Sequence, residues 1–315
     1  MNDTGIKADK YTRGIALMLF CEVFWIMTSA LTKHLTEFYP PFQLLFFRNI
    51  LTVPILYFSL PVIYGSITLR TNRSFLHVLH GVIGAVGMIC LIVGINQTTL
   101  SETVTITYAA PLFITVLSIP FLGERVGFRR WSAVIVGFFG VLVVARPDIE
   151  IDPIIFILLF GTFCFSVTVI IRRFLSRTEK SAVITFYFVL IGSFIGGVGL
   201  YWQWLTPSIF DFGLLIGLGL LAAVTQISLT MAIKETPVSI LSPLFYLSLS
   251  AAVVIDIVFW NIFPDINTIF GAGIIILAGL FIIYREGNLK IFYIIMKKNN
   301  FFEKNSVNVD KNKKI

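Results

Sequence analysis

The chain contains 315 residues, of which 57% are hydrophobic and 13% carry a charge, and its mean hydropathy is +0.90. A soluble domain contains about 25% charged residues, so this composition excludes an ordinary soluble protein and indicates that lipid surrounds much of the chain. The net charge of +7 does not indicate nucleic-acid binding, because the basic residues form short clusters between apolar runs.

Ten apolar stretches follow one another along the chain, and a helix needs roughly 20 such residues to cross a bilayer. In chain order they cover 14–32, 42–64, 75–95, 102–122, 130–146, 154–171, 181–202, 212–233, 237–260 and 266–284. We therefore predict an all-α integral membrane protein with ten transmembrane helices. The first stretch contains Glu22, so we interpret it as a retained helix rather than a cleaved signal peptide.

The distribution of lysine and arginine predicts how these helices are oriented. If the N-terminus is cytoplasmic, 21 of the 24 basic residues fall on the cytoplasmic side, Lys33 and Arg146 fall outside, and Arg48 lies within a span. We expect a multi-pass protein of the inner (plasma) membrane with both termini in the cytoplasm. A cytoplasmic N-terminal tail would cover residues 1–13, and a basic cytoplasmic tail would cover 287–315.

The two halves of the chain carry similar residues in the same order. A shift of 140 residues aligns the first stretch with the sixth, and a shift of 132 aligns the fourth with the ninth. The matched pairs are Phe20 with Phe160, Trp25 with Phe165, Pro111 with Pro243, and Phe113 with Phe245. The halves 14–148 and 149–286 would hold five helices each, so the second would enter the membrane inverted. Inverted repeats are typical of alternating-access transporters.

The first half resembles the EamA-type repeat of the drug/metabolite transporter superfamily. The resemblance is carried by Ala110-Pro111-Leu112-Phe113, by Leu122-Gly123-Glu124-Arg125, and by a glycine-spaced helix that ends near Arg146. It extends over roughly residues 13–286. This resemblance implies two EamA-type repeats of five helices each, and a secondary transporter of small metabolites rather than an enzyme.

Shorter stretches are similar to the S-adenosylmethionine uptake transporters of intracellular bacteria. They are Trp204-Leu205-Thr206-Pro207-Ser208, Phe263-Pro264-Asp265, Phe281-Ile282-Ile283-Tyr284 and Met1-Asn2-Asp3. Those carriers tend to have an acidic residue beside the tyrosine of the ninth helix, whereas this chain has Tyr246-Leu247-Ser248.

Glu22 and Arg48 are ionisable residues within predicted spans, where a charge is costly and usually faces a cavity or a partner. At 1.5 Å per residue, their backbones differ by only about 8 Å in depth across a core ~30 Å thick. One interpretation is substrate binding, in which Arg48 holds a carboxylate and Glu22 faces a cationic centre or a coupling proton. The other interpretation is a structural ion pair between Glu22 and Arg48.

Aromatic residues and prolines complete the candidate site. Four aromatic residues are candidates to line a cavity and stack on an aromatic substrate, or else serve packing alone: Trp25, Tyr108, Phe245 and Tyr246. Pro111 and Pro243 occupy equivalent places in the two halves, and each removes a helix hydrogen bond. We interpret these two prolines as paired helix kinks beside the site.

Other residues carry structural expectations. Asp256 lies near the outer end of its predicted helix, where we expect a solvated carboxylate. His77 and His80 lie near the cytoplasmic entrance of theirs, and we expect an interfacial role rather than a proton relay. Gly192-x-x-x-Gly196 and Gly213-x-x-x-Gly217 predict close approaches between helices.

The predicted partners are a small-molecule substrate and the lipid bilayer. No cofactor or metal ion is expected, because the three cysteines lie in apolar runs without metal-ligand spacing. The leading hypothesis is uptake of S-adenosylmethionine, and the alternative is proton-coupled export of amino acids or drugs. A membrane enzyme or a scaffold is disfavoured, because the chain has no recognisable set of nucleophile and base and its halves form an inverted repeat.

Overall fold

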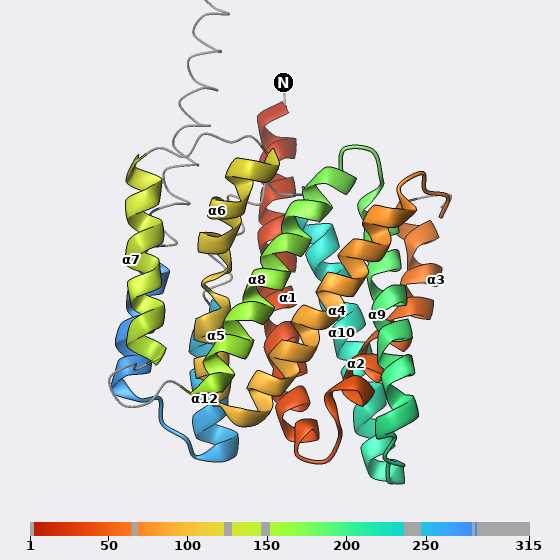
Figure 1. Cartoon of the computed structure of the whole chain (residues 1–315). Helices are drawn as coiled ribbons and strands as arrows, with labels where there is room; N and C mark the ends of the chain where they lie inside the picture. Colours follow the sequence, from red (N-terminus) through yellow and green to blue (C-terminus); the bar gives the residue numbers. More distant parts are fainter. Residues whose placement is uncertain are drawn as a thin grey trace, which may run out of the picture.

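The computed structural model describes residues 3–64, 69–122, 128–145, 152–235, 247–278 and 281, and every element in these ranges is a helix. The all-α prediction is therefore confirmed for this part of the chain (Figure 1). The helices are α1 (Asp3–Thr36), α2 (Pro41–Ile50), α3 (Thr52–Tyr64), α4 (Ser74–Gln97), α5 (Leu100–Thr107), α6 (Ala110–Leu122), α7 (Phe128–Ala145), α8 (Pro153–Leu175), α9 (Ser181–Gln203), α10 (Ile209–Glu235), α12 (Leu247–Trp260) and a last helix, Ile266–Ala278.

Seven helical stretches are long and apolar enough to cross a membrane: Thr12–Thr36, Pro41–Phe58, Ser74–Gln97, Leu100–Phe121, Pro153–Leu175, Val183–Gln203 and Ile209–Leu229. Three further predicted spans contain shorter apolar helices within the described residues: Val134–Val144, Ala251–Trp260 and Ile266–Ala278. Large apolar side chains such as Phe194, Phe210 and Leu277 are mostly exposed on the bundle surface. A surface of this kind suits contact with lipid tails rather than with water.

The N-terminal helix is longer than the sequence pattern predicts. The apolar stretch covers 14–32, but α1 begins at Asp3 and continues without interruption to Thr36. Hydrophobicity predicts only the part of a helix that lies in lipid. A polar first segment that continues the same helix is therefore not detected by a hydrophobicity pattern.

Two predicted spans are each divided into two helical segments. The stretch 42–64 is interrupted at Leu51, between α2 and α3, and 102–122 is interrupted at Tyr108 and Ala109, between α5 and α6. Pro111 is the second residue of α6. A proline in the first turn lacks only an N–H that has no helical partner, so Pro111 begins a new segment instead of bending a continuous helix. Pro243 lies outside the described residues.

Close packing between helices depends on glycines. Helix α9 lies against α2, and a Cβ atom on Gly196 would lie 2.7 Å from the backbone nitrogen of Phe46. The packing expected of Gly192-x-x-x-Gly196 is therefore confirmed. The same expectation for Gly213-x-x-x-Gly217 is wrong, because a Cβ on Gly213 would have no neighbour within 4 Å and one on Gly217 would meet only Leu31, at 3.8 Å. The spacing permits close packing but does not say which face meets a neighbour.

We predict that Gly196→Ala destabilises the protein by about 1–3 kcal/mol, because the added methyl group meets backbone that cannot move aside cheaply. Gly213→Ala is the matched control, since its methyl group would enter open space. Thermal unfolding in detergent, followed by size-exclusion chromatography after heating, should show a lower midpoint for Gly196→Ala alone. Equal midpoints for the two variants would contradict the assigned α2–α9 contact.

Candidate functional site

A buried carboxylate, a serine and a tyrosine connect three segments of the bundle. Glu22 lies on α1 and is 6% exposed, and its carboxylate hydrogen bonds to the side chain of Ser248 in the first turn of α12. The Ser248 hydroxyl also hydrogen bonds to the hydroxyl of Tyr108, which lies at the break between α5 and α6. Each of the two contacts of Ser248 therefore joins residues that are more than a hundred positions apart in the sequence.

The aromatic candidates that the structure describes lie beside this connection. Trp25 and Tyr108 pack against one apolar cluster, whose buried members include Ile26, Val104 and Leu249. Both aromatic side chains are only partly buried, so part of each ring surface is not taken up by packing. The structure thus brings together Glu22, Trp25 and Tyr108, whereas Phe245 and Tyr246 lie outside the described residues.

Arg48 does not pair with Glu22 in this structure. Its Nη1 atom lies 2.7 Å from the sulfur of Met88, which places the guanidinium between α2 and α4. A thioether is a weak acceptor, whereas a guanidinium pairs best with a carboxylate. Both residues are described, and no ion pair joins them, so the interpretation as a structural Glu22–Arg48 pair is wrong for this conformation.

The Ser248 contact was missed from the sequence. In the sequence, Tyr246-Leu247-Ser248 differs from the similar carriers in lacking an acidic residue beside the tyrosine, and this difference predicts no role for the serine. In the structure its hydroxyl lies between the carboxylate of Glu22 and the phenol of Tyr108. A serine carries no charge and is common in membrane helices, so its residue type alone gives little signal.

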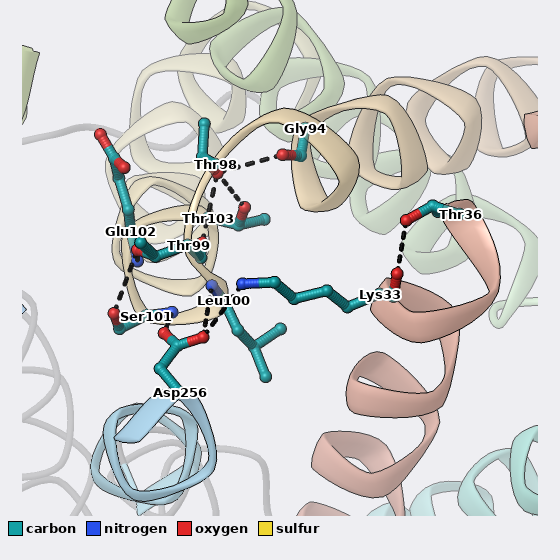
Figure 2. Close-up of polar contacts among 10 residues, drawn as sticks. All are labelled: Lys33, Thr36, Gly94, Thr98, Thr99, Leu100, Ser101, Glu102, Thr103 and Asp256. Carbon is teal, nitrogen blue, oxygen red and sulfur yellow. Dashed lines mark hydrogen bonds and ion pairs between the residues drawn. The ribbon is translucent and has the colours of Figure 1, made fainter. Parts of the chain in front are cut away.

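Asp256 is not the solvated carboxylate that we expected. It is fully buried, and its Oδ1 atom lies 3.1 Å from the Lys33 ammonium nitrogen (Figure 2). Two backbone N–H groups in the first turn of α5 also donate to it, from Leu100 at 3.1 Å and from Ser101 at 2.7 Å. The Lys33 ammonium group also lies 4.7 Å from the centre of the Trp260 ring. The position of Asp256 near the end of its predicted helix suggested a solvated carboxylate. In the folded chain, Lys33 and the N-terminus of α5 lie against this carboxylate instead.

His77 and His80 lie inside the bundle. Both are buried, and their ring nitrogens have no hydrogen-bond partner within the described part of the chain. The His77 ring packs against Tyr187 at 4.7 Å between centroids, and the His80 ring against Phe188 at 4.9 Å. They contribute to α4–α9 packing in this structure.

Comparison with known proteins identifies the family. The sequence model of the EamA-like transporter family matches this chain twice, over residues 12–146 and over residues 152–285. The S-adenosylmethionine uptake transporter of Rickettsia bellii is 30% identical over 262 residues, covering 83% of this chain and 88% of that protein. The pseudopaline exporter of Pseudomonas aeruginosa is 24% identical over 275 residues, covering 86% of this chain and 95% of that protein.

A solved crystal structure shares the fold. It superimposes with a TM-score of 0.62 at 15% sequence identity, over 88% of this chain and 99% of its own. Three findings point to the same kind of protein, a membrane transporter. They are the seven candidate spans, the two successive matches to the family and the similarity to known transporters. The protein is a multi-pass membrane transporter of small metabolites, and the chain belongs to the EamA-like transporter family.

Proposed function

We propose that this transporter takes up S-adenosylmethionine across the inner membrane by alternating access between two inverted five-helix repeats, 14–148 and 149–286. The observation that carries the proposal is the buried connection Glu22–Ser248–Tyr108 beside Trp25. It combines a carboxylate with aromatic surface, and it lies where segments from the two proposed halves meet.

The packing of the helices supports the inverted repeat. In the proposed division α1 corresponds to α8, α4 to α10 and α2 to α9. The two most extensive contacts, α1 with α10 and α4 with α8, exchange under this correspondence, and the contact of α2 with α9 maps onto itself. Two halves related by an axis in the membrane plane should exchange contacts in this way.

Basic residues support a cytoplasmic N-terminus and thus ten spans with both termini inside. The N-terminus, the connection from α3 to α4 and the connection from α8 to α9 lie at the same end of the bundle (Figure 1). The first connection holds Arg70 and Arg73, and the second holds Arg177 and Lys180. This end would face the cytoplasm.

The chemistry of S-adenosylmethionine matches the candidate residues. Its positive sulfonium and amino groups suit the Glu22 carboxylate, and its adenine suits stacking on Trp25 and Tyr108. Its carboxylate suits Arg48, whose guanidinium has a weak thioether acceptor in this structure. We propose that Phe245 and Tyr246 extend the aromatic lining, since they directly precede α12 in the sequence. We also propose that the break beside Pro111 and a helix kink at Pro243 flank the site. The similarity to the S-adenosylmethionine uptake transporter of Rickettsia bellii supports this substrate.

Export is the second candidate function, and the similarity to the pseudopaline exporter favours it. In that case Glu22 would carry the coupling proton, and an imposed pH gradient would drive substrate out of vesicles. Uptake of S-adenosylmethionine by exchange requires no pH gradient. Collapse of the pH gradient should therefore stop proton-coupled export and leave uptake by exchange unchanged.

We predict that Glu22→Gln lowers the apparent affinity for S-adenosylmethionine about ten- to a hundredfold, because the cationic groups lose a charged partner. The matched control is Glu179→Gln, which changes a carboxylate bonded to Thr71 away from the site. Initial uptake rates of radiolabelled substrate over a concentration series, at equal membrane levels of each variant, measure the effect. Unchanged uptake in Glu22→Gln would remove this residue from the site.

We further predict that Arg48→Gln weakens binding of S-adenosylmethionine about tenfold or more but leaves binding of its decarboxylated analogue almost unchanged. The analogue keeps the sulfonium, amino and adenine groups and lacks only the carboxylate. Competition of each unlabelled compound against labelled substrate separates the two contributions. Equal losses for both compounds would show that Arg48 acts on the fold rather than on the carboxylate.

A further inference from the structure

The buried ion pair of Lys33 and Asp256 lies on the same three segments as the candidate site, displaced toward one end of the bundle. Lys33 is eleven residues beyond Glu22 on α1, and Asp256 is eight residues beyond Ser248 on α12. Leu100, at the start of α5, is eight residues before Tyr108. At 1.5 Å per residue, all three offsets are about 12–16 Å. They lead away from the end at which the N-terminus lies (Figure 1).

The contacts at this level hold the three segments together. Asp256 accepts hydrogen bonds from the Lys33 ammonium group on α1 and from the backbone N–H groups of Leu100 and Ser101 on α5 (Figure 2). The N-terminus of a helix carries a partial positive charge, so α5 attracts the carboxylate as well as bonding to it. The carboxylate comes from the second proposed half, and both of its partners come from the first.

We propose that Lys33, Asp256, Leu100 and Ser101 form an outer latch, a contact that closes the candidate site toward the outside and must separate for substrate to enter. The latch is closed in this structure. The inference rests on the proposed function, because only a carrier that alternates between two faces requires such a contact to open and close.

A charged latch suits repeated opening. In the closed state the ammonium, the carboxylate and the helix N-terminus satisfy one another away from water. In the open state water hydrates the same groups well, so their exposure costs less than exposure of an apolar contact of similar size. The two states can therefore lie close in free energy, as a carrier that samples both requires.

The test is access of an external reagent to a cysteine placed between the latch and the site. Ala251 packs in the apolar cluster of Trp25 and Tyr108 and lies between Ser248 and Asp256 on α12. Ala251→Cys, with the three native cysteines replaced by alanine, reports exposure to a membrane-impermeant maleimide added outside intact cells. We expect slow labelling in this parent. We expect labelling about tenfold faster or more when Lys33→Met and Asp256→Asn are added, because the open state gains population.

Two further variants make the result decisive. Lys33→Met alone leaves Asp256 with its two backbone N–H donors, so it should fold and should accelerate labelling to a smaller degree. Asp211→Asn is the matched control, since Asp211 lies in the first turn of α10 and hydrogen bonds to Tyr39 and Ser208. These contacts join none of the three latch segments to another, so labelling of this variant should equal that of the parent. Fast labelling of the parent, or unchanged labelling in both Lys33 variants, overturns the latch. Because labelling needs no substrate, failure of S-adenosylmethionine uptake would overturn the proposed function without changing this readout.

Discussion

A polar group inside a bilayer needs a partner within the protein, and this constraint organises the bundle. The surface of the helices is apolar, and the charged residues Glu22, Lys33 and Asp256 are buried inside. Their partners come from distant parts of the chain, so satisfying them forces α1, α12 and the α5–α6 break to meet. One set of contacts therefore specifies the fold and also gathers the residues that we assign to transport.

Both ends of helix α5 contribute to this arrangement. At its start, α5 presents two N–H groups of its first turn to Asp256. At its end, Tyr108 leaves the helical path and bonds to Ser248. Short segments thus provide polar groups at two depths, about 12 Å apart along one span.

Sequence alone predicted the helical class, the family and several residues that the structure brings together at the candidate site. Glu22, Trp25 and Tyr108 could be found because a charge or an aromatic ring in an apolar run has few explanations. The role of Ser248 could not be predicted, since a hydroxyl in a membrane helix is unremarkable until its neighbours are known. Asp256 and Lys33 were separately visible near predicted helix ends, but their pairing over 223 residues depends on tertiary packing. For the same reason, the glycine motif at Gly196 packed as expected and that at Gly213 did not.

We propose that this chain carries S-adenosylmethionine between the two faces of a membrane. The most direct measurement is exchange in sealed proteoliposomes that contain the purified full-length protein and are preloaded with unlabelled S-adenosylmethionine. We expect saturable entry of radiolabelled S-adenosylmethionine that requires the internal substrate and persists when the pH gradient is collapsed. Labelled substrate that enters no faster than in protein-free vesicles, although the protein is folded and inserted, would contradict the claim.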